Sequence, residues 1–134
     1  MKQARLLLAD SHNIMLRSIG DLLEPGFEIV GMVEDAKTLL KAADILKPDI
    51  AIVDLSLPVA GKDNIARLLK DRNPELKLIV LSVHDEPAVV NEALAAGALG
   101  FVLKRSAAWD LIPAIQEVLE GRTYVSPALG GKVW

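Results

Sequence analysis

Four short apolar runs in this sequence each end in a side chain that can take part in polar chemistry. The end residues are Asp10, Asp54, Ser82 and Lys104. Taken alone, each has a plain structural explanation, because caps, turns and strand ends often carry such residues. Taken together, two carboxylates, a hydroxyl and an ammonium group are what phosphoryl transfer to a carboxylate requires.

The chemistry that these four groups predict is the phosphorylation of an aspartate. The carboxylates of Asp10 and Asp54 would hold a hard divalent cation through oxygen, and one of them would also act as the nucleophile. The cation and the ammonium of Lys104 would neutralise the phosphoryl oxygens as negative charge develops on them. The hydroxyl of Ser82 would donate a hydrogen bond to a remaining oxygen.

A parallel sheet would bring the ends of these runs together, because ligands bind beyond the carboxyl ends of its strands. The run Ile50–Val53 is apolar throughout and mostly β-branched, which is typical of a strand buried on both faces by helices. The second predicted strand contains Gly31, which favours a place at the edge of the sheet. The predicted strands cover residues 6–9, 27–33, 50–53, 78–81 and 99–103.

Apolar residues at helical spacing predict a helix after each strand. The predicted helices cover residues 14–23, 36–46, 61–71, 87–96 and 106–119. Pro113 lies within the last of them, so this helix is either kinked there or begins nearer Asp110. The tail over residues 124–134 contains Pro127 and two adjacent glycines, which predict irregular structure.

The alternation of five strands with five helices predicts an α/β fold with a doubly wound parallel sheet. A chain of 134 residues is long enough for one domain with a hydrophobic core. We therefore expect a single domain, with the four polar end residues at one edge of its sheet.

The composition of the chain excludes several classes of function. Without cysteine it has no disulfides or thiolate metal sites, which fits a cytoplasmic protein. Its two histidines are too few for a histidine-rich metal site, and no apolar run reaches the roughly 18 residues of a membrane span. The net charge is −3 and the 15 basic residues are scattered, which argues against tight nucleic-acid binding by this chain alone.

The sequence around the four end residues resembles the response-regulator receiver (CheY-like) domain of two-component signalling. The matching motifs are Leu8–His12, Asp54–Pro58, Leu81–His84 and Gly100–Lys104. The resemblance covers about residues 4 to 122, and the segment from Gly121 to Pro127 is similar to the LuxR/NarL-type subfamily. It implies a receiver domain over residues 1–122, then a tail or the start of a linker at 123–134. It also implies a flavodoxin-like sheet with strand order 2-1-3-4-5.

The resemblance implies a role for each residue of the site. Asp54 would be the phosphoacceptor, taking a phosphoryl group from a sensor histidine kinase or a small phosphodonor. Asp10, Asp54 and the backbone carbonyl of Ser56 would hold Mg²⁺. Ser82 and Lys104 would contact the phosphoryl group. Such a protein is not an enzyme, beyond intrinsic autophosphorylation and autodephosphorylation.

The resemblance also implies how phosphorylation would be read out. Phe101 occupies the position of an aromatic switch, which would move as Ser82 is drawn toward the phosphoryl group. The helices that flank the fifth strand would form the output face, and the face around the fifth strand and the last helix is a candidate homodimer surface. LuxR/NarL-type proteins usually carry a C-terminal DNA-binding domain that controls transcription, and these 134 residues leave no room for one. The chain is therefore either a receiver cut from a longer regulator or a stand-alone receiver.

Three of the departures from the family pattern bear most directly on the site. The family has two adjacent acids in its first loop, whereas here Asp10 is followed by Ser11. A hydroxyl is a poorer Mg²⁺ ligand than a carboxylate, so Ser11 is only a minor candidate ligand, and we expect weaker metal binding and slower phosphorylation. Arg105 follows Lys104 where many receivers have a cis-proline, which predicts a trans peptide. His84 either influences water near the phosphoryl group or is an exposed loop histidine.

Three other interpretations compete with a phosphorylated receiver. A pseudo-receiver would be a phosphorylation-independent interaction or dimerisation module, with its metal site lost through Ser11. A phosphatase with an aspartate nucleophile would need a second acid two residues after Asp54, where this chain has Ser56. A nucleotide-binding flavodoxin-like protein would need a glycine- or hydroxyl-rich loop after the first strand, where Asp10 would repel phosphate.

Overall fold

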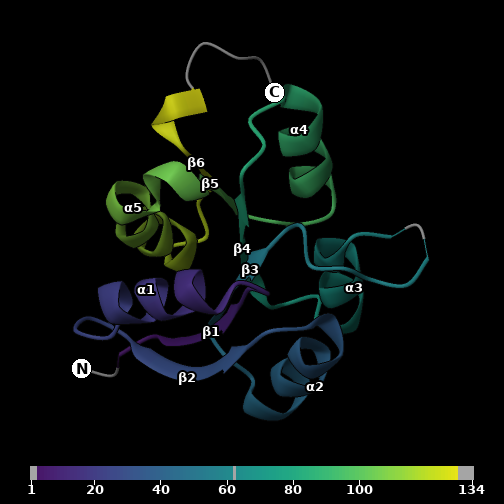
Figure 1. The fold of residues 1–134 in the computed structure, drawn as a ribbon, viewed down its shortest axis with the longest axis vertical. Helices are drawn as coiled ribbons and strands as arrows, with labels where there is room; N and C mark the ends of the chain where they lie inside the picture. Colours follow the sequence, from purple (N-terminus) through teal and green to yellow (C-terminus); the bar gives the residue numbers. More distant parts are fainter. Residues whose placement is uncertain (1–2, 62, 130–134) are drawn as a thin grey trace.

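The computed structural model of the chain describes residues 3–61 and 63–129. The strands are β1 (Arg5–Ala9), β2 (Glu28–Val33), β3 (Ile50–Asp54), β4 (Lys77–Ser82), β5 (Gly100–Leu103) and β6 (Tyr124–Val125). The helices are α1 (Asn13–Leu23), α2 (Ala36–Leu46), α3 (Ile65–Arg72), α4 (Pro87–Ala95) and α5 (Ala107–Leu119), with short 3-10 turns η1 (Lys104–Ser106) and η2 (Pro127–Leu129). Helices α1 and α5 cover one face of the central sheet, and α2, α3 and α4 cover the other (Figure 1).

The strand order is β2-β1-β3-β4-β5-β6, and all neighbouring strands are parallel. This confirms the predicted α/β fold with a doubly wound, flavodoxin-like sheet in the order 2-1-3-4-5, which β6 extends by one short strand. β2, which contains Gly31, lies at the opposite edge as expected. The order reverses between β1 and β3, and such sheets bind ligands beyond the strand ends at this point.

The two covered faces of the sheet explain the continuous apolar runs. All five residues of β3 are buried. Ile50 and Ile52 belong to the core that contains α1 and α5, whereas Ala51 and Val53 belong to the core that contains α2, α3 and α4. Because neither face meets water, the strand is apolar at every position up to Asp54.

Helix α3 begins at Ile65, so the predicted start at Gly61 is wrong. The side chain of Asn64 accepts a hydrogen bond from the N–H of Arg67 (2.9 Å) and caps the helix there. Gly61 has a φ of +83°, which lies outside the helical region. The asparagine cap, rather than the apolar spacing, sets this boundary.

Helix α5 runs from Ala107 to Leu119 with Pro113 inside it. It does not begin nearer Asp110, which lies in its first turn. Because proline has no N–H, the carbonyl of Trp109 lacks its helical donor. Packing of the buried apolar face of α5 on the sheet holds the helix together across this lost hydrogen bond.

The tail that the sequence predicts to be irregular contains a short strand. β6 pairs in parallel with β5, with Phe101 opposite Val125. Beyond β6, the buried hydroxyl of Ser126 accepts a hydrogen bond from the N–H of Leu103 (3.0 Å). The prediction is therefore wrong for residues 124–125, because a two-residue strand has no detectable period and depends on its partner strand. The rest of the tail, 130–134, lies outside the described residues.

Tyr124 joins β6 to α5 through a buried acid. Its hydroxyl donates a hydrogen bond to Asp110 Oδ1 (2.9 Å), and Asp110 Oδ2 accepts one from the hydroxyl of Ser106 (2.6 Å). Burial disfavours the charged phenolate, and this burial together with the hydrogen bond raises the pKa of Tyr124 to about 12.

We expect the free energy of unfolding to fall as the pH rises toward 12, and to fall less in Tyr124→Phe. The unfolded chain ionises near the ordinary tyrosine pKa of about 10, while the folded state holds the phenol neutral. The contribution of the neutral Tyr124 phenol to the free energy of unfolding is therefore complete below about pH 10 and is lost as the pH rises above it. Urea denaturation at a series of pH values measures this. Tyr124 is the only tyrosine, so phenolate absorbance of the folded protein reports it directly, and ionisation near pH 10 would contradict the prediction.

Candidate functional site

Asp10 and Asp54 lie side by side at the carboxyl edge of the sheet. Asp54 is the last residue of β3, and Asp10 follows β1 directly, one position beyond the paired residues Ala9 and Val53. Both side chains are 1% exposed. Two carboxylates buried next to each other repel unless a cation compensates them. The register of β1 and β3 therefore creates a site that needs positive charge.

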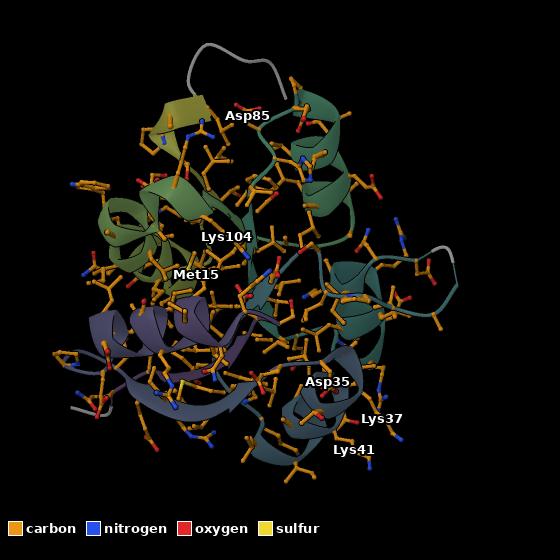
Figure 2. The ribbon with its side chains drawn as sticks, in the orientation of Figure 1. Met15, Asp35, Lys37, Lys41, Asp85 and Lys104 are labelled. Atoms are coloured by element: carbon orange, nitrogen blue, oxygen red, sulfur yellow. The ribbon has the colours of Figure 1, made fainter. Side chains whose placement is uncertain are left out.

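Lys104 supplies positive charge to both carboxylates. It follows β5, and Figure 2 shows it near the middle of the molecule. Its Nζ lies 3.0 Å from Asp10 Oδ2 and 3.3 Å from Asp54 Oδ2, and its side chain is 9% exposed. These are ion-pair distances, but neither buried oxygen accepts a hydrogen bond. Both Oδ2 atoms thus share one ammonium group and keep lone pairs free.

The other oxygen of each carboxylate is held by its own loop. Asp54 Oδ1 accepts hydrogen bonds from the N–H (3.0 Å) and the hydroxyl (2.8 Å) of Ser56. Asp10 Oδ1 accepts a hydrogen bond from the N–H of His12 (2.8 Å). These contacts fix both carboxylates so that their Oδ2 atoms face Lys104. Ser56, predicted to act through its carbonyl, touches Asp54 through its N–H and hydroxyl.

Ser82 and Phe101, the other two predicted site residues, lie on β4 and β5. Ser82 ends β4 and is 3% exposed, and its Oγ accepts a hydrogen bond from the N–H of His84 (2.9 Å). Ser82 and Asp54 line the same cavity, of about 180 Å³. Phe101 is fully buried in the core on the α4 side of the sheet. The structure therefore brings together Asp10, Asp54 and Lys104, and Ser82 lines the same small cavity as Asp54.

The three departures from the family pattern occupy different environments. Ser11 is exposed, and within the described part of the chain no hydrogen bond joins its hydroxyl to either carboxylate. The peptide bond between Lys104 and Arg105 is trans, as predicted. The side chain of His84 is 59% exposed, and its Nδ1 lies 3.6 Å from Glu86 Oε2. His84 is therefore exposed, but it also lines the cavity that Asp54 and Ser82 share, so an influence on water near a phosphoryl group stays a prediction.

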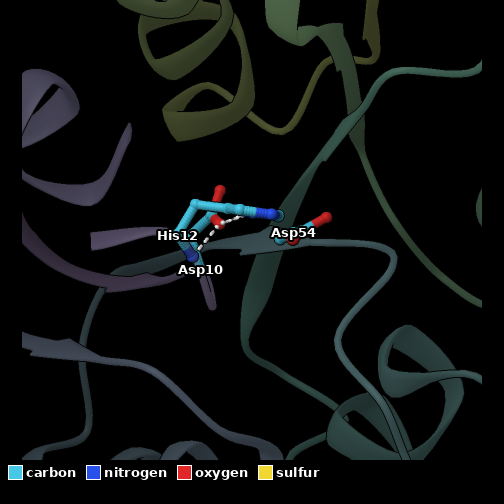
Figure 3. A group of neighbouring side chains, drawn as sticks. All are labelled: Asp10, His12 and Asp54. Atoms are coloured by element: carbon cyan, nitrogen blue, oxygen red, sulfur yellow. Dashed lines mark hydrogen bonds and ion pairs between the residues drawn. The ribbon is translucent and has the colours of Figure 1, made fainter. Parts of the chain in front are cut away.

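Reasoning from the sequence missed His12. Its side chain is 70% exposed, yet its Nδ1 lies 3.1 Å from Asp10 Oδ1. Figure 3 shows the imidazole reaching from Asp10 toward Asp54, and one ligand atom from each of the three residues lies within 4.8 Å of the others. The signal in the sequence was a histidine two residues after Asp10. The count of two histidines excluded a histidine-rich metal site, but it did not address a site made of carboxylates and one histidine.

The arrangement fits a divalent cation. Buried carboxylate oxygens without hydrogen bonds are the ligands that hard cations prefer, and here two of them face one point. The ammonium of Lys104 now offsets part of their negative charge. A bound cation would take over part of that role and leave Lys104 free to contact an anion.

Another cavity in the described structure, of about 710 Å³, lies at the opposite end of the sheet between α2 and the start of β4. Its lining includes the ion pair of Arg72 with Asp44 but none of the residues of the carboxyl-edge cluster.

Among the helices of residues 3–61 and 63–129, none is long and apolar enough to cross a membrane.

The chain is similar in sequence to response regulators and to a transcriptional regulatory protein. A family model described as response regulator receiver domain matches residues 6–116. The transcriptional regulatory protein DegU of Brevibacillus brevis is 31% identical over 125 residues, which are 92% of this chain and 53% of that protein. The response regulator GacA of Pseudomonas aeruginosa is 29% identical over 127 residues, which are 93% of this chain and 59% of that protein. The chain thus spans little more than half the length of these relatives.

Solved structures share the whole fold. A LuxR-family two-component response regulator from Aurantimonas sp. SI85-9A1 has a TM-score of 0.88 and 31% identity, over 96% of this chain and 93% of that chain. The isolated receiver domain of RcsB from Salmonella enterica serovar Typhimurium, in the presence of the phosphomimetic BeF3⁻, has a TM-score of 0.86 and 28% identity. That match covers 96% of each chain.

Proposed function

Because this chain belongs to the response regulator receiver domain family, we propose that it is a phosphorylation-controlled signalling domain in which Asp54 accepts the phosphoryl group. The family model and the relatives confirm the resemblance found in the motifs. One observation carries the proposal of phosphorylation. Asp10 Oδ2 and Asp54 Oδ2 are buried, accept no hydrogen bond and share the single ammonium of Lys104.

The proposed reaction transfers a phosphoryl group from a histidine kinase or a small phosphodonor. A carboxylate oxygen of Asp54 forms a bond to phosphorus, the bond from phosphorus to the kinase imidazole breaks, and the imidazole nitrogen keeps the electron pair. Lys104 is close enough to turn from the carboxylates to a phosphoryl oxygen. Ser82 would reach the phosphoryl group across the cavity that it shares with Asp54.

Mg²⁺ is the proposed cofactor of this transfer. Asp10, Asp54 and the backbone carbonyl of Ser56 would hold it, and when bound it would neutralise phosphoryl oxygens. The exposed hydroxyl of Ser11 supplies no charge, so we expect weak Mg²⁺ binding. We propose that the domain is a phosphoacceptor and not an enzyme, apart from intrinsic autophosphorylation and autodephosphorylation.

The proposed output is a change at the face around β5 and α5. Phe101 lies within β5 and Lys104 directly follows the last residue of this strand, so a movement of Lys104 toward a phosphoryl group would act on the strand that carries the aromatic side chain. Trp109 of α5 is 76% exposed at this face, which suits a homodimer contact. As DegU is a transcriptional regulatory protein, we propose that the complete protein controls transcription through a DNA-binding part outside this chain.

A second candidate function is a pseudo-receiver, an interaction or dimerisation module that works without phosphorylation. It is favoured by one observation, the exposed serine at position 11 where the family has an acid. The two candidates differ in whether Asp54 is modified.

We expect acetyl phosphate and Mg²⁺ to add the mass of one phosphoryl group to the purified wild-type chain and nothing to Asp54→Asn. The reason is that an amide lacks the anionic oxygen that attacks phosphorus. Intact-mass spectrometry over a time course measures the adduct. Asp21→Asn, which changes an exposed acid of α1, is the matched control and should be phosphorylated like the wild type. An adduct of equal yield in Asp54→Asn, or none in the wild type at saturating Mg²⁺, would overturn the proposal and favour the pseudo-receiver.

A further inference from the structure

The carboxyl-edge cluster has a third donor in place of the acid that Ser11 does not provide. His12 brings an imidazole nitrogen within 4.8 Å of a carboxylate oxygen from each of Asp10 and Asp54. The ring extends over the gap between the two carboxylates (Figure 3). Two oxygens and one nitrogen therefore converge where the sequence suggested oxygen donors alone.

The buried oxygens point independently to a ligand at this place. Asp10 Oδ2 and Asp54 Oδ2 belong to side chains that are 1% exposed, and neither accepts a hydrogen bond. Buried carboxylate oxygens normally have hydrogen-bond partners or bind a metal. Lys104 is the charged side chain that faces both of them, and its single positive charge does not neutralise two carboxylates.

The backbone places His12 for this role. It is the N-cap residue of α1, and its N–H donates to Asp10 Oδ1 (2.8 Å), so its Cα stays close to Asp10. Its side chain makes no capping hydrogen bond to the helix. The imidazole approaches from the solvent side, as its 70% exposure shows. It can therefore complete a metal site without filling the cavity beside Ser82.

We propose that His12 is a direct ligand of the divalent cation at Asp10 and Asp54, and that it increases the preference of the site for imidazole-binding transition metals such as Co²⁺ and Zn²⁺ over Mg²⁺. Imidazole suits Zn²⁺ and its first-row neighbours, whereas Mg²⁺ prefers oxygen ligands and water. A neutral imidazole in place of a carboxylate removes one negative charge from the site and changes which metal ions it prefers. The inference rests on the metal site of the proposed function but not on the phosphorylation of Asp54.

The test compares metal binding by the tag-free chain and its variants, using Co²⁺ and Mg²⁺ alone as probes. Isothermal titration calorimetry at a pH above the ordinary histidine pKa of about 6.5 gives both affinities. We expect His12→Ala to lose at least about tenfold in Co²⁺ affinity, since even an outer-shell partner of a metal costs that much. Its Mg²⁺ affinity should change less than about threefold, because oxygen ligands dominate Mg²⁺ binding.

His84→Ala is the matched control, because the chain has only two histidines and His84 lies outside the cluster. It should bind Co²⁺ like the wild type. In NMR spectra of the imidazoles, Zn²⁺ should shift the His12 signals and leave those of His84 in place. Ser11→Asp combined with His12→Ala should strengthen Mg²⁺ binding and reduce the ratio of Co²⁺ to Mg²⁺ affinity relative to the wild type.

Two results would overturn the inference: equal Co²⁺ affinity in the wild type and His12→Ala, or equal Zn²⁺ shifts at both histidines. Either result can occur while acetyl phosphate still modifies Asp54, in which case the proposed function stands and only the role of His12 fails. Conversely, selective Co²⁺ binding that depends on His12, in a chain that forms no phosphoryl adduct, would remove the proposed function and keep the metal site.

Discussion

Replacing Lys104 with methionine is expected to lower the free energy of unfolding of the metal-free protein by about 3 to 5 kcal/mol. The substitution keeps an apolar side chain of similar length but removes the ammonium that lies 3.0 Å from Asp10 Oδ2 and 3.3 Å from Asp54 Oδ2. Both carboxylates stay 1% exposed, so two negative charges would remain buried without a counter-charge. Urea denaturation in the presence of a chelator measures the loss.

The same charge argument predicts which changes should restore the stability that Lys104→Met loses. A divalent cation at about 100 times its dissociation constant stabilises the folded state by about 2.7 kcal/mol, so it should recover a large part of the stability of Lys104→Met. Asp10→Asn combined with Lys104→Met should also recover stability, because only one buried charge then remains. Lys41→Met, which changes an exposed lysine of α2, is the control and should change stability by less than about 0.5 kcal/mol. A loss below about 1 kcal/mol in Lys104→Met would show that the ammonium does not balance the two carboxylates.

The parts of the site that the sequence predicts are those that depend only on the order of the strands. Asp10, Asp54 and Lys104 each end a run that is apolar enough to be a buried strand. Parallel strands end at one edge, so their contact follows from the topology alone. The same periodicity predicts the five main strands and a helix after each of them.

The parts that the sequence does not predict depend on local loop geometry or on a distant partner. The loop after Asp10 folds back so that the N–H of His12 donates to Asp10 Oδ1, and this contact decides that the imidazole faces the carboxylates. The spacing of two residues makes His12 a candidate partner of Asp10 but does not determine this loop conformation. β6 is a strand only because β5 offers it hydrogen bonds, and α3 begins where Asn64 can cap it. A single cap or a two-residue strand has too little periodicity to detect.

Phe101→Ala is expected to lower the free energy of unfolding by about 3 to 5 kcal/mol. The ring is fully buried, and β5 pairs at this residue with Val80 on one side and Val125 on the other. The carbonyl of Phe101 also accepts a hydrogen bond from the N–H of Ser126 (3.0 Å), so the strand has little freedom to close over a cavity. Urea denaturation followed by far-UV circular dichroism measures the change.

The size of this loss also tests whether the ring rests inside or outside the core before phosphorylation. Phe101→Leu keeps most of the apolar volume and should lose less than about 1.5 kcal/mol, which separates the loss of volume from any effect on the backbone. A ring that spent most of its time in solvent would have little burial to lose, and alanine would then destabilise the protein hardly more than leucine does. A large difference between the two variants therefore means that the buried conformation is the resting one. Any switch at this position must then work against the packing energy that the alanine variant measures.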